Sequence, residues 1–253
     1  MSKRVIITGA GSGIGRAIAE CFHDEGAQVV ICDVSEKAMF DVTRAHDGIN
    51  GIVADVGEYD QVKYFIDSAV SLMGGVDVLV NNAGIGGPRA LVEDIQEDDW
   101  AHTLQVNLTG MYYCIKEVVP EMKAQRHGSI INISTGSTRT GLPHRMPYVV
   151  SKAAVNELTH TLAREVGPFN IRCNAILPGA VQGARGDRII AGVAADKGIS
   201  QQEAKEECLR YISMRTDISP TEIGEMACFL ASNRARHVTG QLIGVCGNVE
   251  WEE

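Results

Sequence analysis

The chain lacks three features that would each define a class of protein: an excess of basic residues, a long apolar run and an internal repeat. Its formal net charge is −9 over 253 residues, so we expect no nucleic-acid or acidic-membrane binding, which both reward basic surfaces. No apolar run reaches the ~18 residues of a membrane-spanning helix, and no secretory leader precedes the first apolar run. These absences predict a cytoplasmic globular protein.

Paired cysteines are also missing, because the seven cysteines are odd in number and never spaced Cys-x-x-Cys. This scatter is typical of reduced, mostly buried thiols and argues against a disulfide framework or a zinc site. We therefore expect no metal. The cysteines are Cys21, Cys32, Cys114, Cys173, Cys208, Cys228 and Cys246.

What the sequence does contain is a regular alternation of short apolar runs with amphipathic stretches of helical length. Nearly continuous Val and Ile runs are typical of a parallel sheet with helices on both faces. The pattern predicts one α/β domain, 1–253, with three layers around a doubly wound, seven-stranded parallel sheet. The expected strands are 4–8, 28–33, 51–54, 76–81, 129–134, 172–177 and 242–245, and the expected helices include 14–24, 61–72, 100–123 and 149–165.

One region breaks this alternation. Residues 182–213 are polar and charged, and they lie between an expected strand and the next core helix. Because parallel sheets bind ligands beyond the carboxyl ends of their strands, our hypothesis is that 182–213 is a substrate-binding lid. The alternative is a surface helical insertion.

A glycine-rich segment directly follows the first expected strand and opens the first helix. Glycine permits a tight turn and close approach to a pyrophosphate, for which the helix N-terminus supplies N–H donors. Its position at a strand-to-helix junction predicts a dinucleotide site. The segment is Thr8-Gly9-Ala10-Gly11-Ser12-Gly13-Ile14-Gly15, and the expected contacts come from Gly9, Ser12, Gly13, Ile14 and Gly15.

Asp33 ends the second expected strand, about twenty residues after the glycines, where an acidic side chain bonds the adenosine ribose hydroxyls. Its charge would repel a 2′-phosphate, and no basic residue replaces Ser12 or directly follows Asp33. We therefore predict NAD as the cofactor in preference to NADP. The alternative is that Asp33 caps the following helix.

Two further segments follow expected strands and belong to the predicted cofactor site. Asp55 and Val56 are placed to accept from the adenine amino group, although a simple turn is the alternative for Asp55. The small residues Asn82, Ala83 and Gly84 are suited to lie against the cofactor.

Tyr148 and Lys152 are four residues apart, which on a helix places both on one face, about one turn apart. A free phenol has a pKa of about 10 and is a poor base at neutral pH, but a fixed cation beside it favours the phenolate. The pair predicts proton transfer in alcohol or carbonyl chemistry. An isolated pair is common in helices, so its weight comes from the other motifs.

In this order the motifs resemble those of the short-chain dehydrogenase/reductase family, in its compact single-domain form. The resemblance covers nearly the whole chain and rests on TGxxxGxG at 8–15, NNAG at 81–84, Asn107, YxxxK at 148–152 and PG at 178–179. It implies a Rossmann-like three-layer sandwich and an NAD-dependent oxidoreductase. The implied reaction interconverts a hydroxyl, as in a secondary alcohol, and a carbonyl by hydride transfer to nicotinamide.

The resemblance also implies roles for individual residues. The tyrosine of the YxxxK motif acts as general base or acid, and Lys152 lowers the phenol's pKa and holds the nicotinamide ribose. Asn107 anchors a water that links Lys152 to solvent; the alternative is an asparagine that kinks its helix and pairs with backbone. Pro178, Gly179 and Val181 line the nicotinamide.

The chain departs from the family pattern where a serine usually orients the substrate oxygen, thirteen residues before the tyrosine. Thr135 stands there and keeps the hydroxyl, with an added methyl and a stiffer χ1. We predict that Thr135 takes this role. Ser137 is the alternative and would need a shorter loop, whereas Ser134 would point to the opposite face of the strand.

Two more departures concern the substrate side and the C-terminus. Gly183 replaces a threonine that commonly contacts the cofactor. The usual terminal Val-Asp-Gly-Gly becomes Val-Cys-Gly-Asn at 245–248, and the tail beyond it, with Trp251 as an anchor, either packs at a subunit contact or frays.

Three basic residues precede the tyrosine on the loop expected to border the substrate: Arg139, His144 and Arg145. Arginine offers a bidentate fork to a carboxylate, sulfonate or phosphate. Our hypothesis is a small-molecule substrate with an anionic group. The alternative is a solvated loop or a subunit contact.

The resemblance finally implies a homotetramer or homodimer, assembled through the helices that hold Asn107 and Tyr148. Two other functions stay open: a non-catalytic NAD-bound regulator or scaffold, and an epimerase or dehydratase like the family's extended relatives. The joint presence of Asn107, Tyr148 and Lys152 argues against the first, and the short chain argues against the second.

Overall fold

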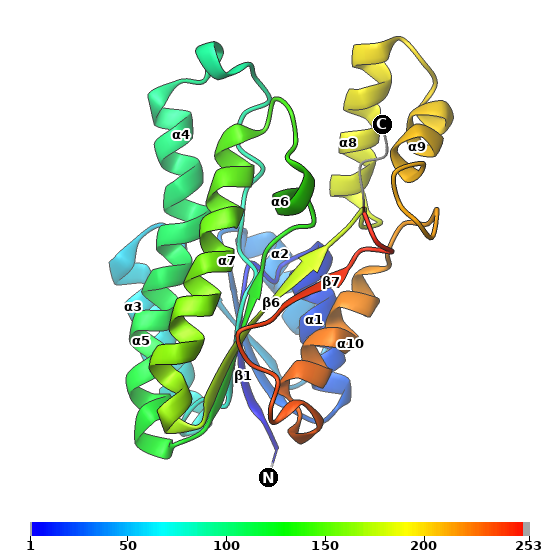
Figure 1. The fold of residues 1–253 in the computed structure, drawn as a ribbon. Helices are drawn as coiled ribbons and strands as arrows, with labels where there is room; N and C mark the ends of the chain where they lie inside the picture. Colours follow the sequence, from blue (N-terminus) through cyan, green and yellow to red (C-terminus); the bar gives the residue numbers. More distant parts are fainter. Residues whose placement is uncertain (1, 250–253) are drawn as a thin grey trace.

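The computed structural model describes residues 2–249, so the predicted contact of Trp251 lies outside the described residues. The chain forms a parallel sheet of seven strands in the order β3-β2-β1-β4-β5-β6-β7, which confirms the predicted fold class (Figure 1). The strands are β1 (Arg4–Thr8), β2 (Gln28–Asp33), β3 (Ile49–Val53), β4 (Val78–Asn81), β5 (Gly128–Ile133), β6 (Ile171–Pro178) and β7 (Leu242–Val245).

Each inner strand contributes side chains to two apolar cores, because successive side chains point to opposite faces of the sheet. In β1, Val5 and Ile7 join one core and Ile6 joins the other, and all three are fully buried. This double burial explains why the strands have continuous Val and Ile runs. One core is covered by α1 (Gly13–Asp24), α2 (Glu36–Ala45) and α10 (Pro220–Ala231), and the other by α3 (Tyr59–Met73), α5 (Gly110–Gln125) and α7 (Met146–Val166).

The strand order places a functional edge between β1 and β4. The chain builds outward from β1 to β2 and β3, then returns to the other side of β1 with β4. At such a switch point the loops after neighbouring strands run in opposite directions and leave room for a ligand. The residues after β1 and β4 are the predicted cofactor segments.

The single helix predicted over 100–123 is wrong in one respect. The structure divides it into α4 (Glu97–Leu104), a π-helical turn (Gln105–Thr109) and α5. A Cβ on Gly110 would lie 2.6 Å from the carbonyl oxygen of Val56, so α5 begins where only glycine lets it approach β3. Amphipathic period alone does not reveal such a turn.

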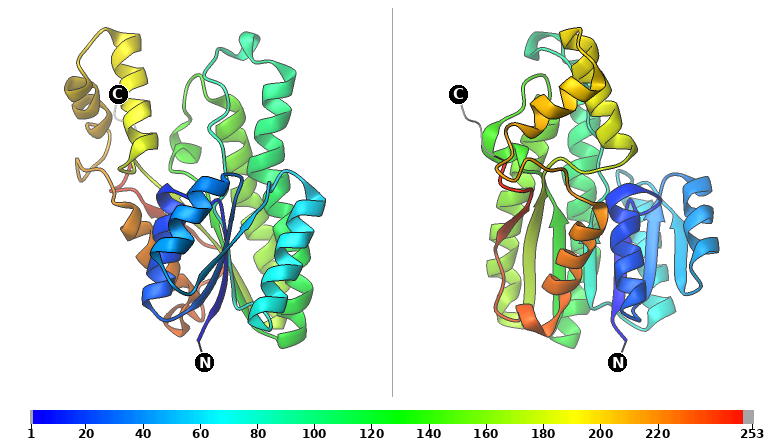
Figure 2. Two further views of the ribbon diagram at one scale, coloured as in Figure 1. Left: turned by 180° about the vertical axis from the view of Figure 1, so that it is seen from behind. Right: turned by 90° about the vertical axis from the view of Figure 1, so that its right-hand side faces the viewer.

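Residues 182–213 rise beyond the carboxyl edge of the sheet as two helices, α8 (Ala184–Lys197) and α9 (Gln201–Leu209), in both views of Figure 2. Ser200 caps α9 in a capping box with Glu203. Only Ala194 and Ala204 of these two helices are buried, so the segment stands out from the core.

Within the described residues, no helix is both long and apolar enough to cross a membrane. The seven cysteines are free thiols, and four of them are completely or almost completely buried in the two cores: Cys32, Cys114, Cys173 and Cys228.

Candidate active site

The loop between β1 and α1 is shaped by close backbone contacts. Gly9 and Gly13 have φ values of +62° and +57°, a conformation that favours glycine. A Cβ on Gly9 would lie 2.7 Å from Cα of Ala83, and one on Gly15 would lie 2.3 Å from the carbonyl oxygen of Gly9. Backbone therefore lines the loop, as a site for a pyrophosphate requires.

The first residues of α1 continue this surface. Ser12 is the exposed N-cap residue, and its side chain makes no capping hydrogen bond. A Cβ on Gly13 would meet no atom within 4 Å, whereas Ile14 packs partly against the core. The N–H groups of the first helical turn have no intrahelical acceptors, and the helix dipole there favours an anion.

The segment after β4 holds the glycine loop in place. Nδ2 of Asn82 donates to the carbonyls of Thr8 at 3.0 Å and Gly9 at 2.8 Å. Oγ1 of Thr8 accepts from the N–H groups of Asn82 and Ala83, each at 3.1 Å. The structure thus brings the two predicted cofactor segments together, and Asn82 fixes the loop.

Asp33 connects the loop to the second strand. Its Oδ2 accepts from the Gly11 N–H and its Oδ1 from the Ser35 N–H, both at 3.0 Å. The N-cap of α2 is Ser35, whose hydroxyl accepts from the Ala38 N–H, so the helix-capping alternative for Asp33 is wrong. The carboxylate instead lies beside the glycine loop.

Asp55 and Val56 follow β3 on the same edge of the sheet. Oδ1 of Asp55 accepts from the Gly57 N–H at 2.8 Å, so one carboxylate oxygen forms a turn. Val56 is buried, and its carbonyl faces Gly110. This contact joins the end of β3 to the start of α5.

Helix α7 carries the Tyr148–Lys152 pair. Tyr148 is half-buried, whereas Lys152 is 3% exposed and donates from Nζ to the Ile133 carbonyl at 2.7 Å. Burial, and then the charge of Arg185, lower the pKa of Lys152 from 10.5 to about 7. A lysine with this pKa can gain or lose a proton near neutral pH.

Asn107 lies in the π-helical turn and is completely buried. Its Oδ1 accepts from the Ile85 N–H at 2.7 Å, and its Nδ2 donates to the Ile85 carbonyl and to Oγ of Ser151, both at 3.0 Å. A Cβ on Gly84 would lie 3.2 Å from Oδ1 of Asn107 and 3.3 Å from Nζ of Lys152. Asn107 thus pairs with backbone and also stands beside the lysine.

The hydroxyls of Thr135 and Ser137 form one group at the end of β5. Oγ1 of Thr135 donates to Oγ of Ser137 at 3.4 Å and accepts from the Ser137 N–H at 3.3 Å. Ser134 is turned away, because its hydroxyl donates to the Lys152 carbonyl at 3.2 Å. The two candidate hydroxyls therefore lie next to each other and could both reach the same substrate oxygen.

Pro178, Gly179 and Val181 follow β6. A Cβ on Gly179 would lie 2.7 Å from Cα of Cys246, so glycine is required where this turn crosses the end of β7. Val181 forms a parallel bridge with Ile218. These contacts fix the path of the chain into the predicted lid.

Gly183 begins that lid with a φ of +111°, which side-chain-bearing residues rarely adopt. The backbone therefore explains the departure from threonine at this position: α8 starts from a conformation that disfavours the family's usual residue.

The three basic residues before Tyr148 have different surroundings. Arg139 is exposed and turns to the last strand, with Nη2 3.5 Å from the Leu242 carbonyl. His144 is exposed with a φ of +65°. Only Arg145 is half-buried near the tyrosine.

Arg185 is the residue that sequence reasoning missed. It projects from the first turn of α8, and its Cζ lies 5.5 Å from the centroid of the Tyr148 ring, which is a cation–π contact. Arg185 and Tyr148 are far apart in the chain, so no spacing in the sequence relates them.

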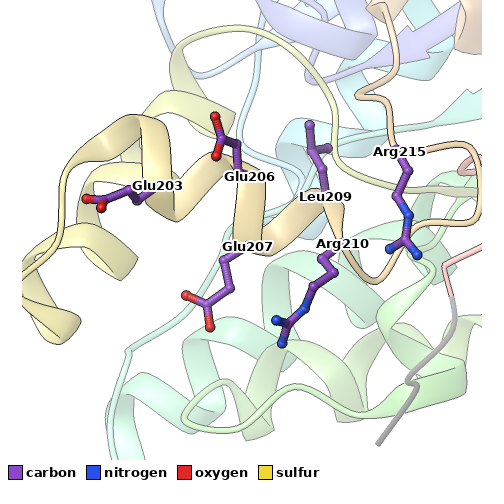
Figure 3. A pocket seen from close by; sticks show the side chains of 6 residues that line it. All are labelled: Glu203, Glu206, Glu207, Leu209, Arg210 and Arg215. Carbon is purple, nitrogen blue, oxygen red and sulfur yellow. The ribbon is translucent and has the colours of Figure 1, made fainter.

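A hollow of about 550 Å³ lies on the predicted lid rather than at this site (Figure 3). It is lined by none of the predicted catalytic residues. Its acidic and basic side chains face solvent, and Glu207 there pairs with Lys197. The hollow is therefore separate from the predicted catalytic residues. The hollow is lined by Glu203, Glu206, Glu207, Leu209, Arg210 and Arg215.

Comparisons with known proteins agree with the fold and the motif order. Residues 9–248 match the family model described as Enoyl-(Acyl carrier protein) reductase. The chain is 36% identical to 3-oxoacyl-[acyl-carrier-protein] reductase FabG of Thermotoga maritima, over 98% of this chain and 97% of that protein. It is 35% identical to the protein of the same name from Staphylococcus epidermidis, over 98% and 99%.

Solved structures extend the likeness. A variant of actinorhodin polyketide ketoreductase with NADPH superposes with a TM-score of 0.93 at 29% identity, covering 98% of this chain and 97% of that one. NAD+-bound xylitol dehydrogenase superposes with a TM-score of 0.90 at 31% identity, covering 97% and 98%. These neighbours are oxidoreductases with different dinucleotides.

The chain therefore belongs to the short-chain dehydrogenase/reductase family. It is an oxidoreductase of that family, with a nucleotide cofactor and a small-molecule hydroxyl or carbonyl substrate.

Proposed function

We propose that this chain is an NAD-dependent oxidoreductase that interconverts a secondary alcohol and a ketone. The observation that carries the proposal is the position of Tyr148, half-buried on α7 with the buried ammonium group of Lys152 one turn away and an arginine over its ring. This arrangement provides a proton-transfer group beside the loops at the carboxyl edge of the sheet.

The residues present fit a dinucleotide. Gly13 presents open backbone at the start of α1, where the positive end of the helix favours a pyrophosphate. Gly84 leaves the space in front of Lys152 free of a side chain. Gly9, Ser12, Gly13, Ile14 and Gly15 would hold the phosphates. Asp33, Asp55, Val56, Asn82, Ala83, Gly84, Pro178, Gly179 and Val181 would contact the rest of the cofactor.

The chemistry proposed for the oxidation direction begins with the substrate hydroxyl. Thr135 holds the hydroxyl oxygen, with Ser137 as its hydrogen-bonding neighbour. Tyr148 takes the hydroxyl proton, and Lys152 and Asn107 would pass it on to solvent. Bound nicotinamide supplies the hydride acceptor. In the reduction direction Tyr148 returns the proton to the carbonyl oxygen.

Asp33 supports NAD as the preferred dinucleotide. Its two oxygens accept from the Gly11 and Ser35 N–H groups, so the carboxylate is held at the end of β2. A fixed negative charge at this position disfavours a 2′-phosphate and favours ribose hydroxyls. One similar structure is named with NADPH and another with NAD+, so the proposed preference for NAD rests on Asp33 alone.

Activity with NAD and Tyr148→Phe tests the proposal. The wild-type chain should reduce NAD with at least one secondary alcohol, followed by absorbance of the reduced cofactor. Tyr148→Phe should lose roughly 10²- to 10⁴-fold in kcat/KM, because the proton-transfer group is gone. Tyr64→Phe, on the exposed surface of α3, is the matched control and should retain activity. Unchanged turnover by Tyr148→Phe would remove Tyr148 from the mechanism.

Reduction of a 3-oxoacyl group is the second candidate, because FabG reductases are among the most similar curated relatives. In that case an acyl carrier protein would present the substrate. Turnover of a 3-oxoacyl thioester at a higher kcat/KM than any free ketone would favour this candidate.

We also propose that 182–213 acts as the substrate lid. Arg89, in the loop after β4, pairs with Asp196 on α8, so the two sides of the proposed entrance are in contact. Arg185 brings the same helix to Tyr148. In a variant with α8 and α9 replaced by a short linker, we expect substrate specificity to be lost and cofactor binding to be retained.

A homotetramer or homodimer through α5 and α7 is the proposed assembly. Tyr112 on α5 is 50% exposed and Val150 on α7 is 41% exposed, which leaves apolar surface on these helices for a second copy. A monomer in light scattering would contradict the proposal.

A further inference from the structure

Two arginines approach Tyr148 from different elements. Arg145 is the N-cap residue of α7, three residues before the tyrosine, and Arg185 lies in the first turn of α8. The guanidinium of Arg185 stands over the phenol ring, with Cζ 5.5 Å from its centroid. Nη1 of Arg145 donates to the Gly87 carbonyl at 3.1 Å, which occupies one of its five N–H groups.

Neither arginine is neutralised within residues 2–249. Other cations on the lid side have acidic partners there: Arg89 pairs with Asp196, and Lys205 pairs with Asp217 at 2.7 Å. No such ion pair involves Arg145 or Arg185 in the part of the chain that the structure describes. The site therefore concentrates positive charge in a chain whose net charge is −9.

These positive charges repel one another. Burial, followed by the charges of Arg185 and Arg89, lowers the pKa of Arg145, and Arg185 also lowers that of Lys152. Like charges around the half-buried Arg145 and the buried Lys152 destabilise the protein, and an anion placed between Arg145 and the exposed Arg185 would reduce that penalty. Arginine is suited to the task because its planar fork binds carboxylate and sulfonate groups in a bidentate manner.

We infer that Arg145 and Arg185 bind an anionic group of the substrate. This group is a carboxylate or sulfonate close to the carbon that bears the reacting hydroxyl or carbonyl oxygen. The inference rests on the proposed redox function and names its substrate class. Arg185 contacts the phenol ring itself, so the anion must lie near the reacting carbon. The phosphate of a long carrier arm would lie too far away.

The dinucleotide is the other possible source of an anion. Its phosphates have their own donors at the glycine loop, at the start of α1, whereas both arginines are placed around Tyr148 on α7. The substrate is therefore the favoured source, and separate measurements of substrate and cofactor affinity distinguish the two.

Paired substrates test the inference. Oxidation of 3-hydroxybutanoate and of its neutral methyl ester would be compared, together with 2-hydroxypropane-1-sulfonate and neutral butan-2-ol. Arg185→Met keeps apolar contact with the ring and removes the charge. It should lower kcat/KM for the preferred anionic member by roughly 10- to 100-fold, while its neutral counterpart changes less than about threefold.

Arg188→Met is the matched control, because Arg188 lies on the same helix and contributes to neither of the pKa shifts of Arg145 and Lys152. It should retain the wild-type preference. Titration of NADH into each variant should give the same dissociation constant. A loss of NADH affinity in Arg185→Met, with no change in anion preference, would assign Arg185 to the cofactor and overturn the inference.

A binding measurement separates failure of this inference from failure of the redox proposal. Propane-1-sulfonate and butanoate are unreactive probes, and calorimetry on the cofactor-loaded protein should detect them with wild type and Arg188→Met but not with Arg185→Met. Binding without any turnover would leave the anion site in place and refute the oxidoreductase mechanism. Equal handling of neutral and anionic substrates by wild type, with no probe binding, would refute the anion site.

Discussion

The two sides of the proposed active site are built in different ways. On the side of β1 and β4, backbone and Asn82 pack so closely that a side chain has no room at Gly9 or Gly15. On the side of α8, arginines and carboxylates meet across exposed surface. Steric exclusion fixes the shape of the cofactor side. On the lid side, charged side chains determine which substrate binds, and a few substitutions can alter them.

The largest expected effect is that of one methyl group on the cofactor side. In Gly15→Ala the new Cβ would lie 2.3 Å from both the Gly9 carbonyl oxygen and Nδ2 of Asn82. Backbone must move to relieve this overlap, so we expect a loss of more than ~3 kcal/mol of stability and of NAD binding. Thermal unfolding and NADH titration measure both.

Gly192→Ala on α8 is the matched change on the lid side. Its Cβ would meet nothing within 4 Å and would lie within a helix, so it should stabilise the protein by up to about 1 kcal/mol. Equal changes in stability in Gly15→Ala and Gly192→Ala would contradict the proposed difference between the two sides.

Lys152→Met should separate catalysis from stability. The variant should lose roughly 10²-fold or more in kcat/KM, because the proposed proton path from Tyr148 loses its buried amino group. The folded-state pKa of Lys152 is about 7 and its ordinary value is 10.5, so the unfolded chain binds more protons between these pH values. The contribution of Lys152 to wild-type stability should therefore become more favourable as the pH rises from about 7 to 10.5.

The substitution removes that pH dependence. The stability of Lys152→Met relative to wild type should be greatest near pH 6 to 7 and should fall toward pH 10, as measured by urea unfolding at several pH values. A difference that is constant with pH would show that Lys152 is not titrating in this window.

A smaller effect is expected from charge on the cofactor side. Asp33→Asn keeps an oxygen for the Gly11 N–H but removes the negative charge. The ratio of kcat/KM for NADP to that for NAD should rise by roughly 10- to 100-fold. Asp41→Asn on the exposed side of α2 is the control, and an unchanged ratio in Asp33→Asn would remove the basis for the NAD proposal.

The smallest effect is expected from the exposed ion pair on the lid side. Asp196→Asn removes the partner of Arg89, and both side chains are more than 40% exposed. Such pairs contribute about 0 to 1 kcal/mol, so the melting temperature and the substrate KM should change little. A KM increase above about tenfold would show that this contact controls closure of the lid.

The sequence predicted the sheet well because its five inner strands are buried on both faces. All seven strands occur close to their expected bounds, although β3 begins at Ile49 instead of 51 and β4 at Val78 instead of 76. The helix over 100–123 was misjudged because a π-helical turn keeps the apolar face nearly continuous. The exact path there depends on Gly110 meeting the Val56 carbonyl, a contact between distant segments.

In the candidate site, too, the sequence predicts local features but not contacts between distant segments. The glycine loop, Asp33, Tyr148 and Lys152 could be predicted because each chemical requirement is local: a turn, a strand end, or one turn of helix. Arg139 was assigned to the substrate side by its position before the tyrosine, but it reaches the last strand. Arg185 could not be found at all.

From the sequence alone follow the order of strands and helices, the glycine loop and the position of Tyr148 and Lys152 one turn apart on one helix. These features depend on residues within one or two turns or one strand of each other, where backbone geometry fixes the neighbours. The tertiary structure alone decided which charges face Tyr148 and that Asn82 supports the loop. Side chains from separate elements come into contact only when the whole chain has folded, and no local sequence pattern predicts such contacts.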